Sequence, residues 1–374
     1  MKKHYDIKPI LKLEADYNMI NGRRSNGKSY AVKELALWEA YHERDYLTNA
    51  PKVRYELAYG RRWRDELKRA DVESYFDDAP INKITGGEYT TVAVYQNDIY
   101  FATVNDETGK KVRGKKIGHC FALTSSTHYK SLTYPKIGNY IFEEYMSENA
   151  QYLPRDVSNL ESIISTIARN DKIRVFLIGN TINPVCPYFR EWGLQGAINQ
   201  KEGTIDIYKK PTAVFDYAAN KWVDSYVKIA VEKCAQTSEV GLMAFGRRAR
   251  SINGTEWETE EHAHLLKPFD AYEVKYQILY KYDSFKFVID LLRDKETREI
   301  TLFVYPFTGE TDTSKIKRRV TDEYTTNFFH TSYLTTLSGF DKLVLELIER
   351  GKVCYSDNLT GTEFLTIKKN KGRY

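Results

Sequence analysis

Gly22-Arg23-Arg24-Ser25-Asn26-Gly27-Lys28-Ser29 is the stretch that decides the fold, because it fits the pattern G-x-x-x-x-G-K-[ST]. Glycines at both ends of such a loop let the backbone wrap around a phosphate group with its amides pointing inward. In this pattern Lys28 reaches the β- and γ-phosphates, and the Ser29 hydroxyl ligates Mg²⁺. The stretch therefore predicts a phosphate-binding loop that takes ATP and Mg²⁺.

The residues on either side of this loop support that interpretation. Tyr17–Asn21 is typical of a short strand that ends at Gly22, and Ala31, Leu35 and Trp38 recur at helical spacing after the loop. A helix that starts near Ser29 adds the positive end of its dipole to the phosphate site. A chance match in a turn is the alternative, and the order of strand, loop and helix argues against it.

A second motif, Gly138-Asn139-Tyr140-Ile141-Phe142-Glu143-Glu144, is an apolar strand that ends in two acids. Neighbouring residues at a strand end point in different directions, so the two carboxylates can take different roles. A hydrolytic enzyme with such a loop needs one carboxylate for hydrated Mg²⁺ and another to polarise the attacking water. We therefore assign Glu143 to magnesium and Glu144 to water. A solvated acid pair at a strand edge is the alternative, which the loop earlier in the chain disfavours.

Two polar residues are further candidates for the γ-phosphate. Asn180 follows the strand-like run Val175–Gly179 and can bind the γ-phosphate or the water, although an ordinary asparagine turn is equally compatible. Arg169 ends a helix whose apolar face includes Val157, Leu160, Ile164 and Ile167. It is a candidate arginine finger that acts on a neighbouring subunit. The alternative is a helix-end arginine that balances the helix dipole.

The pattern along the chain predicts two domains. Strands and helices alternate over residues 1–208, which favours an α/β domain with a mainly parallel sheet. The pattern weakens over residues 209–262, which we predict to be a linker with a helix around Val227–Cys234. Residues 263–374 favour a small α+β domain with antiparallel strands and a final helix around Phe340–Ile348.

Composition excludes several classes of protein. The chain has 374 residues and a formal net charge of +5, with 42% hydrophobic and 29% charged residues, as in ordinary soluble proteins. Its four cysteines form no CxxC pair, which disfavours a zinc site and a disulfide framework. No signal peptide and no run of about 20 apolar residues is present. We therefore expect a cytoplasmic protein without a membrane partner.

Three basic segments are candidate contacts for nucleic-acid phosphates. The first segment is predicted to be a loop that could follow DNA phosphates. A hairpin tip that is merely solvated is an equal alternative. The second and third segments carry no interleaved aromatics and no base-reading motif. Any nucleic-acid binding should therefore be to the backbone and independent of sequence. The segments contain Lys110, Lys111, Arg113, Lys115 and Lys116, then Arg247, Arg248 and Arg250, then Lys315, Lys317, Arg318 and Arg319.

A series of further motifs follows the loop in a fixed order over residues 20–260. They are Tyr30-Ala31, Arg61-Arg62-Trp63, Lys130, Tyr134-Pro135, Ile141-Phe142-Glu143-Glu144, Tyr152-Leu153-Pro154, Arg169-Asn170, Asn180, Pro187-Tyr188-Phe189, Phe245-Gly246-Arg247 and Gly254-Thr255-Glu256-Trp257. With these motifs the chain resembles the DNA-encapsidation ATPases of small tailed phages with protein-primed linear genomes. The region after residue 263 shows no clear motif.

The resemblance implies an additional-strand P-loop ATPase fold in a homomeric ring, a pentamer, docked on the portal of a procapsid in the host cytoplasm. ATP hydrolysis would drive double-stranded DNA through the ring. Arg169 would be the finger acting in trans, and Lys130 would reach a neighbour's nucleotide or signal between subunits. The second domain would be a vestigial RNase H-like nuclease domain that contacts the portal, or the structural RNA of some relatives.

The chain departs from the resembled pattern at one site residue. The magnesium-binding acid is usually Asp, whereas Glu143 is one methylene longer and should shift the carboxylate by about one bond length. Asp283, Asp290 and Asp294 raise the question of a nuclease metal site in the second domain, which packaging of unit-length genomes does not need. A nucleotide kinase and a nucleotide-dependent assembly module remain the alternatives to a motor.

Overall fold

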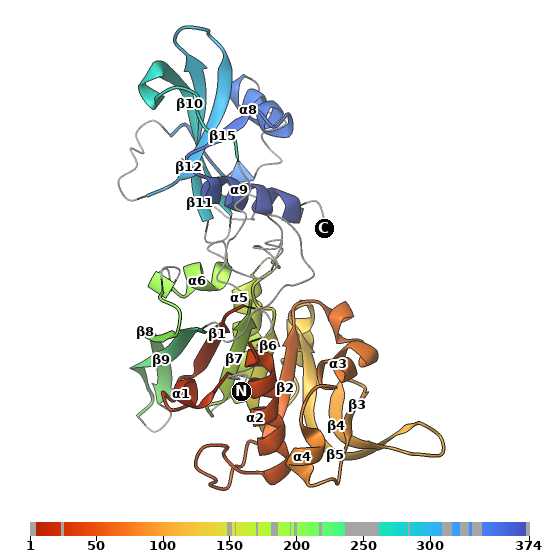
Figure 1. Ribbon diagram of the computed structural model, residues 1–374. Coiled ribbons are helices and arrows are strands. Elements are labelled where there is room, and N and C mark those ends of the chain that lie inside the picture. Colours follow the sequence, from red (N-terminus) through yellow and green to blue (C-terminus); the bar gives the residue numbers. More distant parts are fainter. Residues whose placement is uncertain are drawn as a thin grey trace. The chain divides into compact units, whose positions relative to one another are not determined.

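The computed structural model of the chain consists of two compact units, Met1–Trp257 and Glu258–Tyr374 (Figure 1). The structure describes residues 5–23, 26–147, 152–153, 155–169, 171–180, 186–194, 196–197, 200–216, 219–235, 262–282, 285–308, 316–321, 329–330 and 339–371. In this part of the chain, no helix is long and apolar enough to cross a membrane.

The first unit is built on a nine-stranded sheet with the order β3-β4-β5-β2-β6-β7-β1-β9-β8. Six neighbouring strands, from β5 to β9 in this order, are parallel, and the edge strands are antiparallel. The strands are β1 (Tyr17–Asn21), β2 (Glu56–Arg61), β3 (Thr91–Tyr95), β4 (Asp98–Val104), β5 (Lys111–Ala122), β6 (Ile137–Glu143), β7 (Arg174–Gly179), β8 (Thr204–Asp216) and β9 (Lys221–Lys233).

The parallel core confirms the predicted mixed α/β architecture of the first domain. Strand β7 lies between β1, which precedes the phosphate-binding loop, and β6, which carries the paired acids. In a parallel sheet all the carboxyl ends meet at one edge. The residues that follow β1, β6 and β7 are therefore brought to the same edge.

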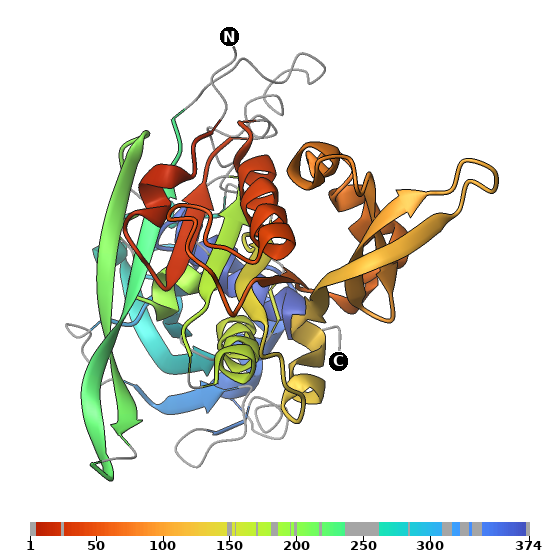
Figure 2. The ribbon, with the colours of Figure 1, turned by 90° about the horizontal axis from the view of Figure 1, so that it is seen from below.

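Helices cover both faces of this sheet. Right-handed crossovers that run in opposite directions along a sheet leave their helices on opposite faces, and this applies to α2 and α5. Figure 2 shows α2 on one face and α5 on the other. The helices and 3₁₀ segments are α1 (Lys8–Leu11), α2 (Lys28–His42), η1 (Arg64–Leu67), α3 (Arg69–Tyr75), α4 (Ile81–Thr85), η2 (Leu123–Tyr129), α5 (Asp156–Ala168) and α6 (Pro187–Glu191).

The core of the first unit explains why α2 lacks a polar face. Val32, Leu35 and Ala36 of this helix are fully buried against the sheet. Leu37 and Ala40 on its other sides are fully buried too, because α4 also packs against the helix. This double burial holds the helix that follows the phosphate-binding loop.

Two predictions for the edges of the sheet are wrong. Residues 209–233, predicted as a linker with a helix around Val227–Cys234, belong mostly to the β8–β9 hairpin, and β9 pairs with β1. Residues 111–116, predicted as a loop, begin the long strand β5. Figure 2 shows the β8–β9 and β4–β5 hairpins at opposite ends of the sheet.

The second unit holds a six-stranded sheet with the order β14-β13-β10-β11-β12-β15. Strands β10, β11 and β12 form an antiparallel meander, whereas β13 and β14 run parallel to β10. The core includes Ile278, Phe287, Leu302, Val344 and Phe364. The elements are η4 (Phe269–Ala271), β10 (Tyr272–Tyr282), β11 (Phe285–Asp294), β12 (Ile300–Pro306), β13 (Arg318–Thr321), β14 (Phe329–His330), α8 (Phe340–Glu349), β15 (Val353–Tyr355) and α9 (Asn358–Lys371).

Candidate nucleotide site

The phosphate-binding loop connects the end of β1 to the start of α2, as its sequence predicts. Gly27 has φ +89°, a left-handed conformation that glycine adopts without strain. A Cβ at Gly22 would lie only 2.8 Å from Cβ of Cys234, the residue that follows β9. Only glycine therefore fits at this position. Asn26 is buried, and its Oδ1 accepts a hydrogen bond from the Lys28 amide at 3.2 Å. Arg24 and Ser25 lie outside the described residues.

The Lys28 side chain joins the loop to the neighbouring strand. It is buried, and its Nζ donates to the carbonyl oxygens of Gly22 at 2.9 Å and Arg23 at 3.1 Å. Nζ also lies 3.3 Å from Oδ1 of Asn180, the residue after β7. The lysine and the asparagine, 152 residues apart in the sequence, are thus brought together as the parallel sheet predicts. The Arg23 side chain points elsewhere and pairs with Glu202 at 3.5 Å.

Glu143 is the last residue of β6 and is buried beside the loop. Its carboxyl group accepts a hydrogen bond from the Tyr75 hydroxyl at 2.8 Å and another from the Ser29 hydroxyl. Burial raises the pKa of the Glu143 carboxyl, although the two hydroxyls and the nearby Lys28 oppose the rise. A buried carboxylate of this kind gains from a cation, which would restore its charged form.

These groups fit a magnesium ion that arrives with a nucleotide. A hydroxyl and a carboxylate are hard oxygen ligands, and Mg²⁺ commonly takes one or two protein ligands together with phosphates and waters. The Ser29 hydroxyl already bonds the Glu143 carboxyl group, and the positive charge of Lys28 acts on the same carboxyl group. Among the described residues, no cluster of three or more His, Cys, Asp or Glu forms a metal cage. One hydroxyl and one carboxyl group as donors suit a metal ion that is also held by phosphates.

Glu144 turns away from its neighbour. Its backbone is left-handed, with φ +52°, and its side chain is 58% exposed. Oε2 accepts a hydrogen bond from Nη2 of Arg61 at 2.9 Å, and the same nitrogen contacts Glu66 at 2.6 Å. The two adjacent acids thus differ as predicted, with Glu143 buried at the loop and Glu144 held by the arginine at the end of β2.

Arg62 fixes the backbone of this acidic turn. Its guanidinium donates to the carbonyl oxygens of Glu144 at 3.3 Å and Tyr145 at 2.6 Å, and it forms a buried ion pair with Asp156 at 2.7 Å. Tyr188 donates to the same aspartate at 2.5 Å. The sequence pointed to Arg61-Arg62 only through the resemblance, and no pattern revealed that Arg62 would be buried.

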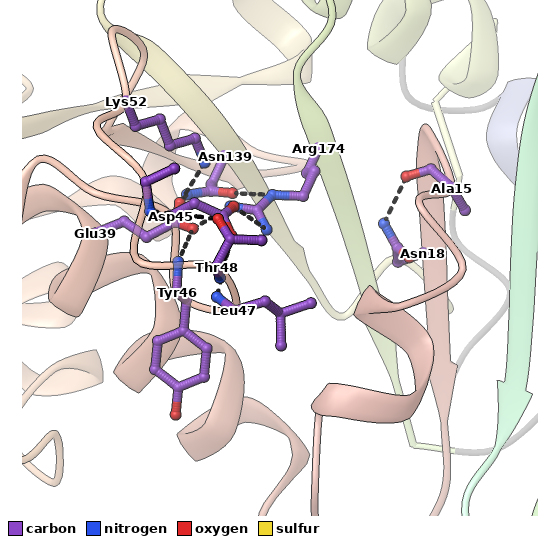
Figure 3. Close-up of polar contacts among 11 residues, drawn as sticks. Ala15, Asn18, Glu39, Asp45, Tyr46, Leu47, Thr48, Lys52, Asn139 and Arg174 are labelled. Atoms are coloured by element: carbon purple, nitrogen blue, oxygen red, sulfur yellow. Dashed lines mark hydrogen bonds and ion pairs between the residues drawn. The ribbon is translucent and has the colours of Figure 1, made fainter.

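A buried polar cluster anchors the far end of α2 (Figure 3). Glu39 has no exposed surface, and it accepts hydrogen bonds from Asn139 at the start of β6 at 2.7 Å and from Arg174 at the start of β7. Lys52 forms a further ion pair with it. Burial alone would raise the pKa of Glu39, but Arg174 and Lys52 hold the pKa below its ordinary value. The helix behind the loop is therefore fastened to the two strands that carry Glu143 and Asn180.

Arg169 and Lys130 lie away from this site. Arg169 follows α5, is exposed, and donates from Nη2 to the Leu132 carbonyl at 3.1 Å, two residues beyond the exposed Lys130. Arg54 bonds the carbonyl oxygens of Ile167 and Ile137, so the last turn of α5 lies where β6 begins. That is the edge of the sheet opposite to the phosphate-binding loop. The two residues are thus close to each other but separate from Lys28, Glu143 and Asn180.

The first basic segment is largely paired. Lys111, Lys115 and Lys116 contact Glu73, Glu43 and Asp98 at 2.9, 2.7 and 2.8 Å. The Arg113 guanidinium lies 4.3 Å from the Tyr95 ring centre and 5.7 Å from that of Tyr100. These two tyrosines come from other strands, so the sequence of the segment did not reveal them. In the third segment Arg318 lies 3.5 Å from Asp341. Arg247, Arg248, Arg250 and Lys315 lie outside the described residues.

The acids of the second unit do not assemble into a metal site within the described part. Asp290 is buried and accepts a hydrogen bond from Gln277 at 2.8 Å. Asp294 pairs with Lys267 at 3.0 Å and accepts the amide of Thr297 in the following turn. Asp283 lies outside the described residues. The roles of Asp290 and Asp294 here are those of ordinary structural acids.

Comparisons with known proteins find relatives among phage DNA packaging proteins. The chain is 26% identical over 205 residues to the DNA packaging proteins of Bacillus phages phi29 and PZA, and each match spans 54% of this chain and 54% of the relative. The matched region is thus about half the length of these curated relatives. In the solved structure of the bacteriophage phi29 viral genome packaging motor assembly, one chain is similar in fold, with a TM-score of 0.57 and 18% identity over 98% of this chain and 99% of that chain. The family model described as Podovirus DNA encapsidation protein (Gp16) matches residues 1–351. The chain therefore belongs to the podovirus DNA encapsidation protein family.

Proposed function

We propose that this chain is the ATPase subunit of a motor that moves double-stranded DNA into a viral procapsid. The observation that carries the proposal is the meeting of Lys28, Asn180, Ser29 and Glu143 at one sheet edge in a member of a DNA encapsidation family. The strand β7 between β1 and β6 is the mark of the additional-strand class of P-loop ATPases, to which we assign the first unit.

The loop residues bind the triphosphate of ATP. Residues 22 to 29 offer backbone amides at the start of α2, whose dipole favours an anion. Lys28 exchanges its contacts with the Gly22 and Arg23 carbonyls for the β- and γ-phosphates, while Asn180 beside it contacts the γ-phosphate. Ser29 and Glu143 would hold Mg²⁺, which would supply positive charge against the phosphate oxygens.

Glu144 is the residue that we assign to the attacking water. It is exposed and lies directly after the buried Glu143, so a water at the γ-phosphate can meet one carboxylate while the other is committed to the cation. Arg61 and the Arg62 clamp on the backbone limit where the Glu144 carboxylate can lie. Polarisation of the water by a positioned base contributes about 10²–10⁴-fold to such reactions.

Arg169 and Lys130 act at the nucleotide site of the neighbouring subunit rather than at the site of their own subunit. Helix α5 has 13 residues, so its far end lies about 20 Å from its start at the nucleotide edge. An arginine side chain does not cover that distance. An arginine finger at this position requires a ring in which the exposed face carrying Arg169 and Lys130 meets the next nucleotide site. We propose a pentameric ring of this kind at the portal of the procapsid, in the host cytoplasm.

The second unit is a vestigial RNase H-like domain in this proposal. An antiparallel meander followed by two strands parallel to its first strand, in the order β14-β13-β10-β11-β12, supports that assignment. The first strand carries Gln277 in its buried centre, bonded to Asp290. The unit contributes contacts with the portal or with a structural RNA instead of DNA cleavage.

ATP hydrolysis by a Glu144→Gln variant tests the catalytic assignment. Because glutamine keeps the shape but cannot accept a proton, we expect ATP binding to remain and hydrolysis to fall about 100-fold or more. A Lys28→Ala variant should lose binding as well. Unchanged hydrolysis in Glu144→Gln would refute the assignment. Turnover only with a phosphate acceptor would favour a kinase, and binding without hydrolysis in the wild type would favour an assembly module.

A further inference from the structure

Tyr75 connects the candidate magnesium ligand Glu143 to helix α3, which lies outside the phosphate-binding loop. The Tyr75 hydroxyl donates to Oε1 of Glu143 at 2.8 Å. Glu143 is one methylene longer than the aspartate of the resembled pattern, and the tyrosine meets its carboxyl group at the end of that longer side chain. A charge-assisted hydrogen bond of this kind fixes the direction of a carboxylate.

Tyr75 is itself held from two sides. Its ring stacks on that of Tyr59 of β2, with ring centres 4.5 Å apart. Lys33 of α2 lies 4.5 Å from the Tyr75 ring centre, and its Nζ donates to the Tyr75 carbonyl at 2.7 Å. Lys33 is buried and lies on the helix that starts at Lys28. A displacement of either α2 or Glu143 should therefore move Tyr75 at the end of α3.

The same helix contacts the β3–β4–β5 sheet through Glu73. Oε1 of Glu73 accepts the backbone amide of Val94 in β3 at 3.0 Å. Oε2 pairs with Nζ of Lys111 at 2.9 Å, and this ammonium also donates to the Val92 carbonyl at 2.9 Å. Lys111 is the first residue of the basic strand β5. Two residues of α3, Tyr75 and Glu73, thus connect the Glu143 carboxyl group to the basic strand β5.

We infer that Tyr75 is a positioning residue for Glu143 and that α3 links the metal–nucleotide site to the β3–β4–β5 sheet. Continuous chains of hydrogen bonds and packed rings are the means by which such a link is carried. The Tyr75 hydroxyl, bonded to Oε1, would hold the Glu143 carboxyl group in one orientation when a cation binds there. The resulting position of α3 sets the contacts that Glu73 makes with Val94 and Lys111. The inference rests on the proposed function, because it assumes a metal–nucleotide complex at Glu143.

Nucleotide binding by a Tyr75→Phe variant tests the first half. This change removes only the hydroxyl and keeps the ring on Tyr59. A fluorescent ATP analogue is titrated with MgCl₂ and, separately, in EDTA. We expect the Mg²⁺ concentration for half-maximal binding to rise about tenfold, with affinity in EDTA unchanged. Tyr41→Phe is the matched control, since it removes a hydroxyl that bonds Glu88, also at 2.8 Å, and should leave both values unchanged.

Hydrogen exchange of the β3 amides tests the second half without reference to activity. In the wild type, Mg²⁺ with a slowly hydrolysed ATP analogue should slow the exchange of residues 91–95, because Val94 donates to Glu73. Tyr75→Phe should abolish this response and leave exchange without nucleotide unchanged. Glu73→Gln should also abolish the response but keep the Mg²⁺ requirement of the wild type.

The outcomes separate the inference from the proposed function. If the wild type binds nucleotide with Mg²⁺ and Tyr75→Phe matches it in both measurements, the inference is overturned and the proposed function stands. If Tyr75→Phe changes the Mg²⁺ requirement but not the exchange response, the link through α3 is overturned. If the wild type itself shows no Mg²⁺-dependent nucleotide binding, the proposed function is overturned, and the inference with it.

Discussion

Glu143 and Glu144 are adjacent in the sequence, yet the left-handed backbone at Glu144 sends their carboxyl groups to different partners. One is buried with the Tyr75 and Ser29 hydroxyls, and the other is exposed against Arg61. A positive φ at a non-glycine residue costs free energy and persists only where surrounding contacts hold it. Arg62, which bonds the carbonyl oxygens of Glu144 and Tyr145, supplies those contacts.

Replacement of Arg62 by methionine should therefore unfold the first unit more easily. The change keeps much of the side-chain volume but leaves the buried Asp156 without its ion-pair partner. Loss of one partner of a buried pair costs about 3–5 kcal/mol of the free energy of unfolding. Urea denaturation of the first unit measures this loss.

Lys83→Met is the control for that measurement. Its ammonium lies 3.9 Å from Glu34, and its side chain is 81% exposed, so the free energy of unfolding should change by no more than about 0.5 kcal/mol. Equal denaturation midpoints for Arg62→Met and Lys83→Met would show that Arg62 does not hold the turn.

At the scale of elements, the segment before α1 ties β9 to the phosphate-binding loop. The Tyr5 amide donates to the Asn26 carbonyl at 3.3 Å, and the Tyr5 hydroxyl donates to Glu232 of β9 at 2.6 Å. Burial raises the pKa of Glu232 from 4.5 to about 7. Folding thus favours the protonated form of this carboxyl group.

This shift predicts how stability depends on pH. A carboxyl group whose pKa is raised by folding contributes its full stability below pH 4.5 and loses it as pH rises through about 7. Glu232→Gln cannot ionise and keeps an acceptor for Tyr5. Its free energy of unfolding, relative to the wild type, should therefore increase from pH 5 to pH 8. Parallel urea-denaturation profiles of the two proteins over that range would contradict the predicted effect.

The spacing of apolar residues predicted core elements of the first unit and missed a hairpin at the edge of its sheet. The predicted strand at Tyr17–Asn21 and the helix around Val157–Ile167 are confirmed as β1 and α5. The apolar residues of α5 recur at helical spacing, whereas β1 is marked by the phosphate-binding loop that follows it. The β8–β9 hairpin was missed because its outer half is exposed on both sides, with Val214 at 55% and Trp222 at 69%, so no alternation marks it. Elements such as β1 and α5 were enough to predict the mixed α/β class.

The residues of the candidate site that belong to a sequence motif could be predicted. Those that reach the site only through contacts in the folded chain could not. The pattern around Lys28 and the acids after Phe142 identify themselves in the sequence, and the parallel sheet brings Asn180 to them. Tyr75 and Arg62 carry no local signal, because their partners lie 68 and 94 residues away in the chain. The assigned roles of these residues remain predictions.

At the scale of the whole molecule, the proposal requires each active site to be shared between two subunits. Arg169→Ala and Lys28→Ala proteins should each hydrolyse little ATP alone. Mixed together, they should recover activity, because some interfaces then join an intact loop to an intact Arg169 from the neighbour. A mixture of Lys28→Ala with Glu144→Gln should recover none, since both residues serve the same subunit's site. Failure of every Arg169→Ala mixture would exclude a finger acting in trans.

The central claim is that this P-loop enzyme acts on double-stranded DNA, and its ATPase rate with and without that DNA tests it most directly. We expect double-stranded DNA of any sequence to stimulate hydrolysis, and the DNA concentration for half-maximal stimulation to rise steeply with salt, because the contacts are to backbone phosphates. Glu144→Gln should show no stimulated rate. An ATPase rate that double-stranded DNA leaves unchanged at low salt would contradict the account.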